Sequence, residues 1–111
     1  MTFGSALNHN FDGFDFDGVI LDRAIFGDIN LRGIKLSGAS LKGCDVSNTN
    51  FSDCNLSGAN FSDAILMNCR FDRADLRNAI LENCNLEMAS FAEANLSGAN
   101  LSGSKIYGVS V

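Results

Sequence analysis

The chain has no proline, a single histidine and no long apolar run. The lack of proline excludes a polyproline segment, and the 111 residues contain no stiff linker. The first eight residues, MTFGSALN, hold neither a basic residue nor a continuous apolar stretch, so we expect no secretory signal. No later stretch reaches the roughly 20 apolar residues of a transmembrane helix. These absences predict a cytoplasmic protein without membrane contact, and the length predicts one domain.

The sequence contains no uninterrupted block of like charge. Thirteen acidic residues against eight basic ones give a net charge of −5, which argues against binding to a nucleic-acid backbone. The charged residues are spread along the chain without a block of like sign, so there is no acidic or basic tail.

What the sequence does have is a period of five. Every fifth residue from Phe11 to Val111 is Phe, Leu, Ile or Val, at 21 consecutive positions. At an apolar content of 46%, such a run has a chance probability of about 10⁻⁷. We call each of these residues the centre of a repeat.

A second column of mostly small residues lies two positions before each centre. From Phe14 to Val109 this column holds nine Ala, four Cys, one Thr, one Ser and five larger apolar residues. All 21 charged residues fall at the other three positions of the repeat. This partition predicts that the centres and the small column form the core, and that the other positions form the surface.

The apolar spacing alternates between two and three residues, which fits neither common secondary structure. On a helix, at 100° per residue, the apolar groups would spread around the whole circumference. A flat strand requires strict alternation, which the extra residue breaks once per repeat. A short extended segment followed by a turn satisfies the spacing, with Gly, Asn, Asp and Ser supplying the turn chemistry. The pattern therefore predicts a chain that winds around a filled apolar axis.

Several repeats carry a recognisable motif. The segments Ala-Asn-Phe-Ser-Asp (59–63), Ala-Asp-Leu-Arg-Asn (74–78) and Ala-Asn-Leu-Ser-Gly (94–98 and 99–103) resemble the A(D/N)LXX motif of pentapeptide-repeat proteins. The resemblance covers residues 9–111 as a single domain, preceded by a short lead-in or cap at residues 1–8. It implies an all-β fold, a right-handed quadrilateral β-helix with four repeats per coil and about five coils.

Four repeats per coil place residues 20 apart above one another, so we expect Leu56 and Leu76 to stack. We expect a second interior ladder at Phe11, Leu31, Phe51, Phe71, Phe91 and Val111. The bulkier members of the small column are expected to plug the first coil together with two residues of the lead-in. These are Phe14, Val19, Ile29 and Ile34, with Phe3 and Leu7.

The last coil is expected to expose unpaired backbone and apolar side chains, because Val111 is itself a repeat centre. Such an edge tends to recruit another chain. We therefore predict a homodimer joined through Ile106, Tyr107, Val109 and Val111. The resemblance implies the same arrangement, since well-studied members often pair end to end at their C-termini. The alternative is a last coil that frays in water.

Candidate catalytic and metal-binding residues are few, and we predict none of either kind and no cofactor. The cysteines at 44, 54, 69 and 84 all lie in the inward column and have neither CxxC spacing nor a neighbouring histidine, so we interpret them as core residues. His9 has no partner that would make it a general base. A filled interior leaves no small-molecule pocket, so we predict that the protein is not an enzyme.

Two groups of charged residues are candidates for a binding site. The acidic cluster in the first coil is interpreted as a solvated rim rather than a calcium site, because its members point from different faces. It comprises Asp12, Asp15, Asp17, Asp22 and Asp28. The arginines at 70, 73 and 77 alternate with Asp72 and Asp75, which we expect to neutralise them locally.

Exposed apolar residues give the best candidate for a partner-binding patch. The repeat maps Ile25, Ile65, Met67 and Met88 to one face. It maps Ile20 and Ile80 to the face before it. The alternative is that surface isoleucine merely favours strand geometry and needs no partner.

Two functions follow from different features. The patch, with no catalytic constellation, favours a rigid scaffold that binds an unknown protein partner. The resemblance implies an alternative, a DNA mimic that binds a type II topoisomerase such as gyrase. Magnitude argues against mimicry, because a duplex of about 24 Å carries roughly 14 negative charges whereas the whole chain carries a net −5.

Overall fold

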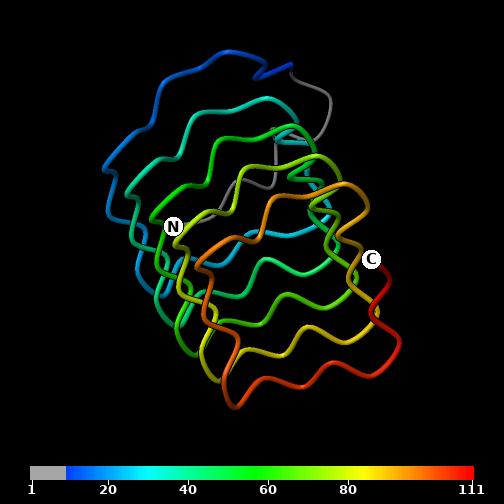
Figure 1. Cartoon of the computed structure of the whole chain (residues 1–111). Coiled ribbons are helices and arrows are strands. Elements are labelled where there is room, and N and C mark those ends of the chain that lie inside the picture. The colour runs from blue at the N-terminus through cyan, green and yellow to red at the C-terminus, as the bar shows by residue number, and fades with distance from the viewer. Residues whose placement is uncertain (1–9) are drawn as a thin grey trace.

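The computed structural model describes residues 10–111, which wind into stacked coils running from the blue to the red end of Figure 1. Sixteen parallel bridges each join residues that lie 20 apart, such as Asn55 to Asp75. One turn of the coil therefore takes 20 residues, which is four five-residue repeats. Within residues 10–111 there is no helix and no continuous strand, since each repeat contributes a single bridging residue just before its centre.

Backbone hydrogen bonds between coils hold the stack together. The amide of Leu56 donates to the carbonyl of Asp75 in the next coil at 2.8 Å, and the amide of Gly58 donates to that of Arg77 at 2.9 Å. Equivalent pairs recur along the chain, so each coil is hydrogen-bonded mainly to the coils directly before and after it.

A turn follows every centre from Phe11 to Ile106 except Phe26, where the chain only bends, and it directs the chain into the next side of the coil. The carbonyl of Leu56 accepts the amide of Ala59 at 3.0 Å, which closes the turn. The second residue after each centre, from Gly13 to Gly108, has a positive φ of 56–79°. Nine of these residues are glycine and seven are Asn or Asp, the residue types that adopt this conformation most readily.

The interior is filled by the two columns that the sequence predicts to be inward. Every residue of both columns from Ala24 to Phe91 is buried, Leu56 and Leu76 among them. The rings of Phe51, Phe71 and Phe91 stack in a ladder, with centroids 5.3 and 5.0 Å apart. Phe61 meets Phe51 and Phe71 edge-on at 5.9 and 6.2 Å. Both arrangements are favourable for aromatic pairs, and the predicted ladder is confirmed at these positions.

The first coil only partly matches the predicted plug. Ile29 and Ile34 are buried, but Phe14 is 50% exposed and lies against Phe11 at the rim. The Phe14 ring packs on the centres Phe11 and Phe16, with centroids 5.5 and 6.4 Å away, so it covers the first coil only in part. Phe3, Leu7 and the predicted cap at residues 1–8 lie outside the described residues.

The aromatic ladder generates a stability prediction. We expect Phe71→Ala to lower the free energy of unfolding by about 3–5 kcal/mol, because it opens a cavity between two stacked rings. Phe14→Ala is the matched control and should cost about 1 kcal/mol, since half of that ring is already in water. Urea unfolding followed by circular dichroism measures both. Equal losses would contradict a ladder that carries much of the core energy.

Candidate interaction surface

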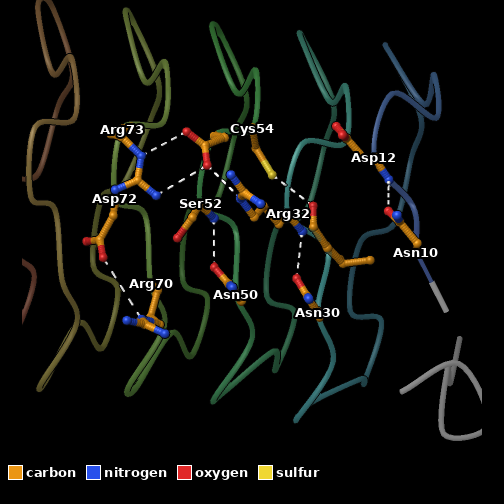
Figure 2. A network of polar contacts seen from close by, with 12 residues as sticks. Asn10, Asp12, Asn30, Arg32, Asn50, Ser52, Cys54, Arg70, Asp72 and Arg73 are labelled. Carbon is orange, nitrogen blue, oxygen red and sulfur yellow. Dashed lines mark hydrogen bonds and ion pairs between the residues drawn. The ribbon is translucent and has the colours of Figure 1, made fainter. Parts of the chain in front are cut away.

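The cysteines are core residues, as predicted. All four are buried, none is in a disulfide, and three donate to main-chain carbonyls of the preceding coil. Cys54 Sγ lies 3.0 Å from the carbonyl oxygen of Leu31 (Figure 2), and Cys69 Sγ lies 3.1 Å from that of Val46. Burial raises the pKa of Cys44, Cys54 and Cys69 to about 12, so these thiols stay protonated at neutral pH. They lack the electropositive, exposed setting of a reactive cysteine.

On the outside, most repeats satisfy one turn amide with an Asn or Asp side chain. Asn50 Oδ1 accepts the amide of Ser52 at 2.9 Å, and Asn30 Oδ1 accepts that of Arg32 at 3.0 Å (Figure 2). Every Asn or Asp directly before a described centre makes this bond, which is an Asx turn. These residues are Asn10, Asp15, Asn30, Asp45, Asn50, Asn55, Asn60, Asp75, Asn85, Asn95 and Asn100.

Where the residue before the centre is Ser or Lys, an aspartate of the preceding coil can take over. Asp17 accepts the amide of Ser37 at 2.8 Å, and Asp22 accepts that of Lys42 at 3.0 Å. Asp72 does the same for Ala92 at 3.2 Å. Three aspartates of the surface are therefore part of the turn chemistry.

Four repeats carry isoleucine at this position instead: Ile20, Ile25, Ile65 and Ile80. Within residues 10–111, no side chain accepts the amide that lies two residues after any of them. Each isoleucine therefore replaces a polar residue that the fold elsewhere uses, and the change leaves an amide uncapped. A strand preference alone would not require this exchange, because the Asn and Asp repeats form the same bridges.

The structure brings together only part of the predicted patch. Ile65 is 40% exposed and lies in the same repeat as the partly exposed Met67, and Met88, 55% exposed, is in the next coil. Ile25 is 62% exposed but is separated from Ile65 by Asp45, which bridges to both.

The other two predicted patch residues are not neighbours. Ile20 bridges to Ser40, and Ile80 bridges to Asn60 and Asn100. Ile20 is exposed and Ile80 is half-buried, and they lie three coils apart along one ladder.

A hollow of about 260 Å³ lies at the start of the Ile25 face, and the sequence analysis missed it. It is lined by Ile25, Phe26, Gly27, Asp28, Asp45, Ser47 and Asn48. Gly27 makes it possible, because a Cβ there would lie 2.8 Å from the carbonyl oxygen of Ser47. The available signal was that no other described repeat has glycine directly after its centre.

Ion pairs occupy two other sides of the rod. Arg32 and Arg73 reach the carboxylate of Asp53 from the coils on either side, at 2.7 and 3.0 Å (Figure 2). These guanidinium groups, first Arg73 and then Arg32, lower the pKa of Asp53. Arg77 pairs with Asp75 at 2.7 Å and lowers the pKa of that carboxyl.

The predicted local neutralisation of the arginines holds for two of three. Arg77 pairs within its repeat, and Arg70 lies 3.9 Å from Asp72. The prediction is wrong for Arg73, which pairs with Asp53 one coil away because the stack brings them together. Among residues 10–111, no group of three or more His, Cys, Asp or Glu side chains is placed to hold a metal ion.

The last coil exposes most of the residues predicted to form a dimer interface. Ile106, Tyr107 and Val111 are 60, 80 and 90% exposed, and Val109 is half-buried. The inward centres Leu96 and Leu101 are also only partly buried.

A tube of stacked five-residue repeats with a filled apolar interior defines the class of protein as a solenoid. Two family models match the chain: pentapeptide repeats in eight copies over residues 69–106, and a pentapeptide repeat region over residues 7–80. The chain belongs to the pentapeptide-repeat family, whose members form right-handed quadrilateral β-helices and are generally structural or interaction modules.

Solved structures agree with the family. A pentapeptide repeat protein from the Arabidopsis thaliana thylakoid lumen is 29% identical, with a TM-score of 0.67 over 92% of this chain and 68% of its own. HetL, involved in heterocyst differentiation regulation in the cyanobacterium Nostoc, is 22% identical with a TM-score of 0.67 over 83% of this chain. This chain spans 48% of HetL.

A third similar structure is QnrB1, a plasmid-mediated fluoroquinolone resistance protein. It is 23% identical, with a TM-score of 0.60 over 96% of this chain and 74% of its own. At 22% and 23% identity, the likeness of HetL and QnrB1 to this chain extends to the fold alone. A search of curated proteins gives no match.

The buried thiols generate a pH prediction. Such a thiol has a pKa of about 8.5 in the unfolded chain and a higher pKa in the folded protein. At a pH between these two values, it keeps its proton in the folded state only. Stability should therefore be intact at a pH well below about 8.5 and fall as the pH rises through it, by about 1.4 kcal/mol in total between pH 7.5 and 9.5 for each buried thiol. Urea unfolding at pH 7.5 and 9.5 measures the slope. Cys69→Ala should reduce it by one thiol's share, and the control Ser57→Ala should not.

Proposed function

We propose that the protein is a non-catalytic interaction module, a rigid rod of about five coils that presents the surface around Ile65 and Met67 to a protein partner. The observation that carries this proposal is the placement of isoleucine at a surface position that otherwise holds Asn, Asp, Ser, Lys or Arg. An apolar side chain at the surface that leaves a turn amide uncapped is consistent with selection for binding. The buried interior and the family's general character support a role without catalysis.

We further propose that two copies pair through the last coil. Ile106 and Val111 are inward by register but largely exposed, so a second copy stacked on this end would cover both. A two-fold arrangement would place the same residues of each copy in contact. The cytoplasmic location expected from the sequence stays a prediction.

Topoisomerase binding by DNA mimicry is the alternative. Two observations support it: the net charge of −5, and a fold similar to that of QnrB1. The distribution of charge opposes it, because Arg32, Arg73 and Arg77 neutralise carboxylates on the sides of the rod. A duplex presents no such cations. A gyrase supercoiling assay separates the two functions.

Substitutions at Ile65 test the interaction role. Ile65→Asn restores an acceptor for the amide of Met67, so we expect a free energy of unfolding within about 0.5 kcal/mol of the parent. Ile65→Ala restores none and should lose about 1 kcal/mol. Both should weaken binding at least tenfold to a partner identified by mass spectrometry on the immobilised chain and then purified.

The matched control for binding is Lys35→Asn, which makes the same kind of change at the equivalent position on another side. It should bind the purified partner like the parent. Unchanged binding by both Ile65 variants would remove the proposed surface.

Light scattering at about 50 μM tests the pairing of two copies. We expect twice the mass of one chain, and a single-chain mass for Ile106→Asp, because a carboxylate cannot be buried unpaired at the interface. Ile20→Asp, an exposed isoleucine near the other end, is the control and should stay dimeric. A monomeric parent protein would contradict the proposal.

A further inference from the structure

The side of the rod that carries Ile65 combines unpaired acids with exposed apolar side chains and a hollow. We call this side the Ile65 face and define it by the outward residues of the repeats centred on Phe26, Val46, Leu66, Leu86 and Ile106. Its charged residues are Asp28, Asp45, Glu87 and Lys105. Within residues 10–111, none of these four makes an ion pair, whereas five arginine and aspartate side chains elsewhere pair within 3.0 Å.

Two of these acids line the 260 Å³ hollow, from adjacent coils. One oxygen of Asp45 accepts from the amide and hydroxyl of Ser47, at 3.4 and 3.1 Å. That bond fixes the Asp45 side chain and leaves its second oxygen without a hydrogen bond among the described residues. The carboxylate of Asp28 has no hydrogen bond within that part of the chain.

The neighbouring side demonstrates what such a carboxylate binds in this fold. Asp53 holds two guanidinium groups that extend from the coils above and below it. Asp28 and Asp45 also lie in adjacent coils, but no cation within residues 10–111 forms an ion pair with either. Their arrangement is complementary to a lysine or arginine supplied from outside.

The size and rim of the hollow indicate a side chain rather than a free small molecule. Small-molecule sites usually measure about 300–1,000 Å³ and are more enclosed. Exposed Ile25 forms one wall, and Ile65 lies two coils further along the same ladder, at roughly 10 Å. An incoming segment would therefore contact two aliphatic side chains, Ile25 and Ile65. The carboxylate of Asp45 lies between these two, and that of Asp28 lies in the hollow beside Ile25.

We propose that the Ile65 face binds a basic segment of a partner protein, with a lysine or arginine seated between Asp28 and Asp45 and aliphatic side chains on Ile25 and Ile65. This inference rests on the proposed interaction function and adds the chemistry of the partner. The uncapped amide of Gly27 lies beside the same hollow and offers the segment a hydrogen-bond donor.

An NMR titration of the ¹⁵N-labelled full chain tests the assignment. The probe is an acetylated, amidated peptide of four Leu-Arg pairs. Shift changes should concentrate at Ile25–Asp28, Asp45–Asn48 and Ile65. Peptides with Leu replaced by Ser, or with Arg replaced by Glu, should bind at least tenfold more weakly, because each lacks one half of the complementarity.

The double variant Asp28→Asn with Asp45→Asn should raise the Kd of the probe at least tenfold. Asn keeps the Asx turn at residue 45 and tolerates the φ of 56° at residue 28, so the variant is expected to fold, and the spectrum itself reports this. Asp63→Asn with Glu93→Gln removes the same charge from other sides and should change the Kd less than twofold.

Two outcomes overturn the inference: equal loss in both double variants, which indicates long-range charge only, or shift changes spread over all sides. Binding to the purified partner distinguishes failure of this inference from failure of the proposed interaction function. If the Asp28/Asp45 variant binds that partner normally while Ile65→Asn does not, the interaction role stands and the basic segment is wrong.

Discussion

The tube depends on one backbone constraint, a left-handed residue in every repeat. From Gly13 to Gly108, the second residue after each centre has a positive φ, and that conformation turns the chain by one side of the coil. Arg23, Arg73, Met88 and Glu93 adopt it without the advantage of Gly, Asn or Asp. The stacking of coils must therefore impose the bend even where the local sequence disfavours it.

The period alone was enough to predict the core. Leu56, Leu76 and the Phe51–Phe71–Phe91 ladder lie where the stride of five places them, because an apolar position repeated 21 times can be buried only if the centres face one common axis. Contacts between coils were harder to predict from the sequence. Arg73 pairs with Asp53 rather than with its sequence neighbours, and this follows only once the length of a coil is known.

Features that interrupt the repeat were the hardest to interpret. Gly27 is visible in the sequence as a departure, yet the hollow beside it depends on how near the Ser47 carbonyl approaches. The exposure of Phe14 depends on packing at the rim of the first coil, where no earlier coil constrains the ring in the described residues. Periodicity carries no information on either point.

The repeat separates the residues that build the fold from those available for binding. Inward columns supply the core and Asx turns supply the surface polarity, so an outward residue that performs neither task is a candidate for function. Ile65 and Met67 are such residues, and they lie in the middle of the stack with a coil bonded on each side. A surface held rigid in this way loses little conformational entropy on binding, which favours affinity from a small contact area. The last coil has a neighbour on one side only among the described residues, so ordering it at an interface costs more.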